Sequence, residues 1–250
     1  MKKGLLIRVG IDSTAGGWNA PCDERSFCYV PMGSSDDLTD DYDPGYRIYQ
    51  RAVSAFVPDT APNSVRWPSR LPRYGHFDPD FEELTYGDCR QRAARIRSAL
   101  ADGDGSFIVF YAGLRSIYSN ELVYSIIGFY SIEHIVPGPA VRRADWHRNA
   151  HTRNGGCSDP DTVVVFARPH ESGRLLHHIP IGHYRRRAYR VTPKLLDAWG
   201  GLDVHDGFIQ RNVFLPRFLD GDRFLRWFER QKPVLICEQN PKAPTPNKTL

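Results

Sequence analysis

The sequence predicts an α+β protein with a mixed or barrel-like β-sheet core and a few flanking helices. Segments with strand character outnumber helical ones, and the longest lie centrally without a regular alternation of strand and helix. The chain has 250 residues, 41% hydrophobic and 25% charged, which is typical of a globular protein with a real core. We expect a single α+β domain over residues 1–239. Residues 240–250 contain three prolines and are expected to form a disordered tail.

The N-terminal part is expected to contain short elements separated by irregular chain. Gly4–Gly10 has the pattern of a strand that runs into a glycine-rich turn, and Arg25–Pro31 that of a second short strand. Acidic residues between 34 and 45, and prolines between 61 and 73, predict loops. Arg90–Leu100 should form an amphipathic helix, because apolar residues recur there at helical spacing among four arginines.

The central and C-terminal parts contain the longest apolar segments. Three buried strands are expected, at Ser106–Gly113, Leu122–His134 and Thr162–Arg168. A threonine and a proline at 192–193 favour a short helix that ends at the glycines 200–201. A further helix, Asp220–Gln231, and a last strand, Pro233–Cys237, complete the expected elements.

Composition and charge limit the classes of protein. The five cysteines are scattered without a CxxC pair, so neither a zinc ribbon nor a disulfide framework is indicated, and reduced thiols in the cytoplasm are the simplest account. No apolar run is long enough to span a membrane. Residues 1–125 have a net charge of −3 and residues 126–250 one of +7. The basic half suits a polyanion such as nucleic acid, and the alternative is an unevenly charged solvated surface.

Residues 73–89 are the most informative stretch, because they combine carboxylates, a histidine and two tyrosines without the apolar period of a helix or strand. Such a segment is expected to contribute little to a core. Near the N-terminus, Arg8-x-Gly10-x-Asp12-Ser13-x-x-Gly16-Gly17 follows the first strand. Its glycines and serine can expose backbone N–H groups to a phosphate, although neither P-loop nor Rossmann spacing is met. The alternative is a tight turn.

These two stretches, with the Thr85-Tyr86-Gly87-Asp88 run, resemble the nucleotide modification associated domain 3 family. Asp206–Arg211 is similar to a further family element, and Gln210 and Arg211 are therefore candidate ligand-binding residues. The resemblance implies a context of DNA modification or phage defence and no particular reaction. The central segments 103–113 and 124–130 also resemble PUA-like barrels, several of which bind RNA or flipped bases.

The acidic stretches supply the candidate catalytic residues. They are Asp12, His76, Asp78, Asp80 and Asp88, with Arg8, Ser13, Gly16, Gly17 and Tyr86 as candidate ligand-binding residues. Paired acids can act as general bases, share a proton or bind a metal. They can equally be turn and cap residues, as Asp-Pro-Asp favours such geometry. Metal binding is the minority interpretation because a third acid at ligand spacing is missing; no metal ligands are assigned and the cofactor is unknown.

Two further clusters have both a functional and a structural interpretation. His147 and His151 have the His-x-x-x-His spacing of helical metal ligands, but the HExxH signature is absent and hydrogen-bonded histidines are the simpler explanation. Arg185, Arg186, Arg187 and Arg190 are interleaved with tyrosines and can bind nucleic acid. The alternative is a charged edge strand.

The leading hypothesis is a cytoplasmic protein of a DNA-modification or phage-defence system that acts on, or recognises, a modified base, with nucleic acid or nucleotide as its partner. The runner-up is a non-catalytic reader with a PUA-like pocket, in which Tyr111 or Trp146 stacks on the base. A third hypothesis is a subunit that binds partner proteins. Whether the protein is an enzyme does not follow from the sequence.

Overall fold

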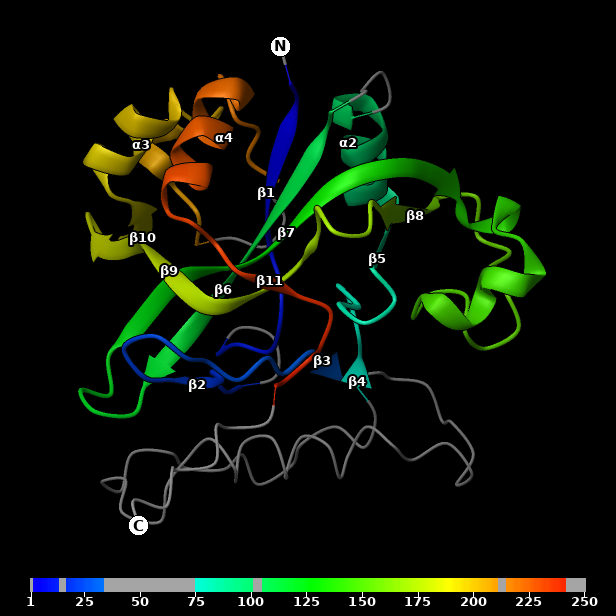
Figure 1. Cartoon of the computed structure of the whole chain (residues 1–250), viewed down its shortest axis with the longest axis horizontal. Coiled ribbons are helices and arrows are strands. Elements are labelled where there is room, and N and C mark those ends of the chain that lie inside the picture. Colours follow the sequence, from blue (N-terminus) through cyan, green and yellow to red (C-terminus); the bar gives the residue numbers. More distant parts are fainter. Residues whose placement is uncertain (1, 14–16, 34–74, 101–104, 211–214, 242–250) are drawn as a thin grey trace.

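A nine-stranded mixed β-sheet organises the chain (Figure 1). The computed structural model describes residues 2–13, 17–33, 75–100, 105–210 and 215–241. The loops expected at 34–45 and 61–73 lie outside the described residues, as do the candidate residues Gly16 and Arg211 and most of the expected tail. Asn240 is described, and its side chain forms hydrogen bonds with the backbone N–H and carbonyl of Tyr29.

The main path through the sheet is β1-β6-β7-β8-β5. Its strands are β1 (Gly4–Arg8), β5 (Thr85–Cys89), β6 (Phe107–Ser116), β7 (Leu122–Pro137) and β8 (Thr162–Ala167). β1 and β6 run parallel, whereas the other neighbours on this path are antiparallel. The shorter β2 (Pro21–Cys22) also pairs with β6, and β3 (Met32–Gly33) pairs with β4 (Gly75–His76) in a separate two-stranded sheet.

β7 is shared between two parts of the sheet. Its first half pairs with β9 (Gly173–Arg185), which in turn pairs with β10 (Ala188–Val191) and β11 (Leu235–Ile236), while its second half pairs with β8. Register shifts occur along both pairings, and such irregularities bend a strand. The sheet stays open within the described chain. The α+β class is therefore confirmed, whereas the barrel-like form and the PUA-like resemblance are not.

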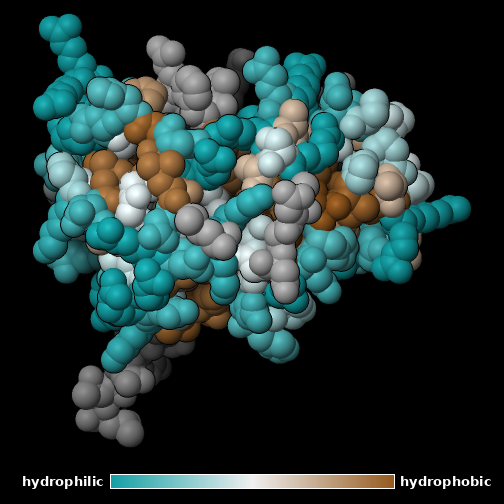
Figure 2. Space-filling view, turned by 90° about the horizontal axis from the view of Figure 1, so that it is seen from above, coloured by the Kyte–Doolittle hydropathy of each residue, from teal (hydrophilic) through white to brown (hydrophobic). Residues whose placement is uncertain are grey.

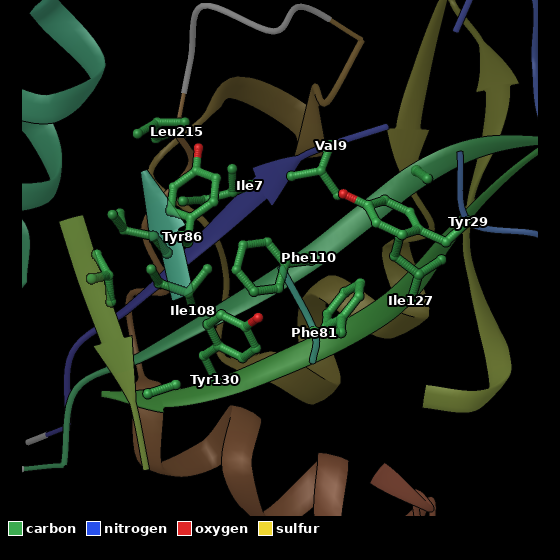
Figure 3. Close-up of a cluster of buried hydrophobic side chains, with 14 of the residues drawn as sticks. Ile7, Val9, Tyr29, Phe81, Tyr86, Ile108, Phe110, Ile127, Tyr130 and Leu215 are labelled. Atoms are coloured by element: carbon green, nitrogen blue, oxygen red, sulfur yellow. The ribbon is translucent and has the colours of Figure 1, made fainter. Parts of the chain in front are cut away.

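Both faces of the central strands are buried, as their continuous apolar sequences require. Ile108 and Phe110 of β6 point to a first face, together with Ile7 of β1 (Figure 3). Phe107, Val109 and Tyr111 alternate with them and point to the second face. The polar stretch 73–89 does contribute to the first core, contrary to expectation: Phe81 and Tyr86 are almost fully buried there.

A different set of helices covers each face (Figure 1). Helix α2 (Arg90–Leu100) packs on the first face through Ala93, Ile96 and Leu100, and its bounds are those that the sequence predicts. Helices α3 (Pro193–Trp199) and α4 (Gly221–Arg230) cover the second face. Their outer surfaces are largely hydrophilic, with apolar side chains in separate patches (Figure 2). None of the helices in the described residues is long and apolar enough to cross a membrane.

The ends of α3 follow from local chemistry. The Thr192 side chain accepts a hydrogen bond from the Leu195 N–H, and Gly200 adopts the left-handed conformation that ends a helix. The described part of the chain also contains three short 3₁₀ helices: η1 (Gly138–Ala140), η2 (Arg143–Arg148) and η3 (His205–Gly207).

The secondary structure differs from the sequence-based expectation in three places: one expected strand is absent and two observed strands were not expected. Residues 25–31 form no strand; they are a loop whose Phe27, Tyr29 and Val30 are nevertheless buried in the first core. The long β9 is missing from the expectation, because residues 173–185 mix histidines, glycines and a proline with few consecutive apolar residues. β5 is missing for the same reason, since its buried side chains include a threonine and an aspartate.

Candidate functional site

A cavity of about 670 Å³ opens where β5 meets the N-terminus of α2. Its volume is typical of small-molecule sites. Residues 86–92 form one wall, Arg8 and Val9 at the end of β1 contribute to another, and Met32 lies at its edge. His76 and Asp78, two residues apart in the stretch that begins with β4, and the distant His151 complete the lining.

His76, Asp78 and His151 form the most concentrated chemical cluster of this cavity. Asp78 Oδ2 lies 2.7 Å from Nε2 of His76 and 2.9 Å from Nε2 of His151, and the two Nε2 atoms are 3.3 Å apart. The imidazole rings pack edge to face. Although these distances are short, the buried Oδ2 of Asp78 makes no hydrogen bond of regular geometry. These three atoms therefore lie within 3.3 Å of one another.

The surrounding backbone fixes this cluster. Asp78 Oδ1 accepts hydrogen bonds from the Gly87 N–H at 2.9 Å and from the Asn149 side-chain amide at 3.4 Å. The Asn149 side-chain carbonyl in turn accepts from the His151 N–H at 3.0 Å. A Cβ on Gly87 would lie 2.2 Å from Cδ2 of His151, so this position must be glycine for the imidazole to reach Asp78.

The ionisation of the cluster follows from its charges. Burial alone would raise the pKa of Asp78, but the neighbouring His76 and His151 outweigh it and hold the pKa well below its usual value. Burial would lower the pKa of His151, and the Asp78 carboxylate reverses this and raises it. Asp78 is therefore ionised at neutral pH, and it stabilises a proton on the facing imidazole.

A second cluster joins β5 to α2 in the same cavity. The Tyr86 hydroxyl donates to Asp88 Oδ2 at 2.5 Å, and Nε of Arg92 donates to the same oxygen at 2.7 Å. Nη2 of Arg92 also donates to the Tyr86 hydroxyl at 2.9 Å. Burial raises the pKa of Tyr86 well above its ordinary value, so the phenol stays protonated. Asp88 is thus the counter-ion of Arg92 and orients it along the cavity.

Asp80 has the geometry of a turn residue, the alternative that the sequence leaves open. Its Oδ1 accepts from the backbone N–H groups of Glu82 and Glu83 at 3.1 Å and from the Gln239 amide at 2.8 Å. Its Oδ2 lies 2.8 Å from the Arg153 guanidinium. Asp80 is not among the residues that line the cavity.

Arg8, Asp12, Tyr111 and Gln210 lie beside the cavity, and of these four Arg8 is the residue that lines it. Nη2 of Arg8 lies 2.7 Å from Asp12 Oδ2 in a buried ion pair, and Nη1 donates to the Gln210 carbonyl. The Tyr111 hydroxyl donates to the Ile209 carbonyl at 2.5 Å, and its ring is fully buried. The structure thus places Asp12 and Tyr111 outside the cavity that holds Asp78. Ser13 and Gly17 are exposed and do not line it either.

Trp146 is also held elsewhere. Its indole N–H donates to the Val141 carbonyl at 3.0 Å, and its ring packs on a small cluster that contains Val164 and Phe166. His147 is exposed and does not lie on a common helical face with His151, since η2 ends at Arg148. His151 is paired with His76 instead.

The expected nucleic-acid-binding arginines gather around one aspartate. Arg185 Nη2 lies 2.5 Å from Asp206 Oδ1, and Arg186 and Arg190 lie 3.2 and 3.8 Å from Oδ2. Hydrogen bonding to Arg185 lowers the pKa of Asp206, so this carboxylate remains charged among the arginines. Arg186 and Arg187 are exposed, whereas Arg185 and Arg190 are partly buried.

Three residues that form or support the histidine cluster are not identified from the sequence. The His-x-x-x-His pattern pairs His151 with His147 and not with His76, and Asn149 and Gly87 are not singled out. A local pattern cannot identify them, because Asp78 and His151 are 73 positions apart and meet only through β5. The one usable signal is the glycine between Tyr86 and Asp88, which marks a close approach of another group to the strand.

Comparison with known proteins identifies a protein family. The family model described as nucleotide modification associated domain 3 matches residues 3–208. No curated protein and no solved structure matches the chain. The matched range includes His76, Asp78, His151 and every cavity-lining residue.

Proposed function

Because the chain belongs to the nucleotide modification associated domain 3 family, we propose that it modifies a nucleotide, free or within a nucleic acid, in the cavity between β5 and α2. The observation that carries the proposal is the position of His76, Asp78 and His151 in the same cavity as two arginines at the start of α2. Modification of a base or sugar needs proton transfer, and a nucleotide brings phosphate charge that needs a cation.

The histidine cluster supplies the proton transfer. His151 has a raised pKa and an ionised aspartate beside it, so it can donate a proton near neutral pH and take one back. Asn149 and Gly87 hold the His151–Asp78 pair in place, so the ring does not have to reorganise when the charge changes. His76 shares the carboxylate and offers a second imidazole at the same point.

The part of the cavity wall at the start of α2 suits an anion. Arg90 and Arg92 both lie in the first turn of α2, where the helix dipole is positive, and Arg90 is exposed. Asp88 neutralises one of the two guanidinium groups, which leaves a net positive charge on this wall. The apolar side chains of Val9 and Met32 provide a surface for a base.

The same contacts favour an enzyme over a reader. Both aromatic residues that a reader needs for stacking, Tyr111 and Trp146, donate hydrogen bonds to backbone carbonyls and pack in cores outside the cavity. We propose that a polynucleotide substrate, if there is one, is held by Arg186 and Arg187, which are exposed at the end of β9. On this proposal the protein works in the cytoplasm, within a DNA-modification or phage-defence system and with its partner proteins.

Ligand titration tests the proposal. The purified chain is titrated with the common nucleoside monophosphates and with short single-stranded DNA and RNA by calorimetry and fluorescence anisotropy. The wild type should bind at least one of these ligands, Arg90→Ala should bind it several-fold more weakly, and His147→Ala should bind it like the wild type. Binding that is equal in Arg90→Ala and the wild type, or absent with every ligand, contradicts the assignment of this cavity.

A further inference from the structure

We propose that His76, Asp78 and His151 form a binding site for one divalent transition-metal ion, with ligand atoms Nε2, Oδ2 and Nε2. Sequence patterns assign no metal ligands to this chain, because the third ligand, His151, lies 73 positions away from Asp78. The inference goes beyond the proposed function, since an ion can be measured there whatever the substrate is.

The geometry of the three atoms fits a metal ion. Separations of 2.7, 2.9 and 3.3 Å place them on a circle of about 1.7 Å radius. A point about 1.2 Å above their plane is then about 2.1 Å from each atom, which is the length of a bond from zinc to histidine nitrogen or carboxylate oxygen. Bonds from that point enclose angles of about 80°, 87° and 104°, close to the right angles between adjacent ligands of an octahedron.

A chemical argument supports the same conclusion. Two imidazole nitrogens crowd one carboxylate oxygen, yet Oδ2 of Asp78 accepts no hydrogen bond of regular geometry from them and is buried. Three potential ligand atoms within 3.3 Å of one another are an arrangement that a cation stabilises. Two histidines and one carboxylate that leave positions open are a ligand set of transition metals, whereas Mg²⁺ and Ca²⁺ prefer oxygen ligands.

The outer contacts are those of a prepared metal site. Metal-binding carboxylates are usually hydrogen-bonded through the oxygen that does not bind the metal, and Asp78 Oδ1 accepts from Gly87 and Asn149. Asn149 also fixes the backbone of His151. All three ligands line the cavity of about 670 Å³, so the remaining coordination positions are available to a substrate or water.

A metal ion and a proton compete for Nε2 of the two histidines, so the proton transfer of the proposed function belongs to the metal-free cluster. The competing explanation is that the two histidines only share protons with Asp78 and bind no metal. The experiment separates the two with purified protein and metal alone, in the absence of any nucleotide. Chelator-treated wild type is titrated with Zn²⁺ and Co²⁺ against a chromophoric competitor, with Mg²⁺ as the unfavourable ion. His76→Ala and His151→Ala are compared with His147→Ala, an exposed histidine on the neighbouring segment.

We expect one equivalent of Zn²⁺ or Co²⁺ in the wild type and in His147→Ala. Affinity should fall at least about 100-fold in His76→Ala and in His151→Ala, whose melting curves establish that they are folded. The absorption spectrum of the cobalt-bound wild type gives a readout that needs no variant: weak d–d bands without sulfur-to-cobalt charge transfer indicate nitrogen and oxygen ligands.

Three outcomes overturn the metal site: less than a tenth of an equivalent bound by the wild type, unchanged affinity in both histidine variants, or a thiolate band that identifies Cys89 as a ligand. A wild type that binds metal but no nucleotide removes the proposed function alone. A wild type that binds nucleotide but no metal removes this inference alone.

Discussion

Gly87→Ala is the most informative single substitution, because it adds one methyl group where β5 passes the histidine cluster. The new Cβ would lie 2.2 Å from Cδ2 of His151, 2.8 Å from Asn149 Oδ1 and 3.1 Å from Nε2 of His151. The imidazole cannot remain in place beside it. The backbone N–H of Gly87 donates a hydrogen bond to Asp78 Oδ1, so β5 cannot easily shift away from the histidine ring.

The size of the effect follows from these distances. An ordinary contact requires about 3.4 Å, so His151 must move by about 1.2 Å, several times the roughly 0.2 Å tolerance of a metal–ligand bond. Loss of this ligand should weaken metal binding at least about 100-fold. The overpacking itself should lower the free energy of unfolding by about 1–3 kcal/mol. Each kcal/mol lost should lower Tm by about 2–4 °C.

The assay combines thermal unfolding with metal and nucleotide titration of the same preparation. Gly4→Ala is the matched control, because its Cβ would lie 2.2 Å from the Phe107 ring, in the core of the second face. Gly4→Ala should be destabilised but bind zinc and nucleotide like the wild type. The reasoning is refuted if Gly87→Ala keeps the wild-type metal affinity, or if Gly4→Ala loses it while still folded.

Three further outcomes are expected. Asp12→Ala leaves the buried Arg8 without its counter-ion and should cost about 3–5 kcal/mol in urea unfolding, so a variant as stable as the wild type would contradict the ion pair. Burial lowers the pKa of His178 below 6.5 in the folded protein. As the pH is lowered through 6.5, the unfolded chain therefore binds a proton at His178 more readily than the folded protein, and the free energy of unfolding decreases. The stability gap between the wild type and His178→Gln should accordingly narrow below pH 6.5 in unfolding titrations; a constant gap would refute the shift. Replacing Arg186 and Arg187 by alanine should reduce the slope of log affinity against log salt by up to about two phosphate contacts, and an unchanged slope removes this patch from the interface.

Local signals predict the helices well. Alanines and arginines at helical spacing define α2 to the residue, and Thr192 and Gly200 set both ends of α3. The central strands are also predicted, because their apolar runs are long enough to be buried on both faces. Loops such as 25–31 escape prediction, since a buried loop and a strand have the same apolar composition.

The site is predicted only in part, for a physical reason. His76, Asp78, Tyr86 and Asp88 are close in sequence, and the structure brings them into one cavity. Asp80 lies between them in sequence, yet it caps a turn, and composition cannot separate these two uses of a carboxylate. His151 joins the cluster through sheet pairing and the loop after η2, which no local pattern describes.

Nucleoside mass spectrometry in cells tests most directly whether this cavity modifies nucleotides. DNA, RNA and free nucleotide pools are compared in cells that lack the gene and in cells that express the wild type, His151→Ala or His147→Ala at equal levels. The account predicts a nucleoside of altered mass with the wild type and with His147→Ala, and its loss with His151→Ala. An altered nucleoside that persists in His151→Ala, or identical nucleosides in all four strains, would contradict it.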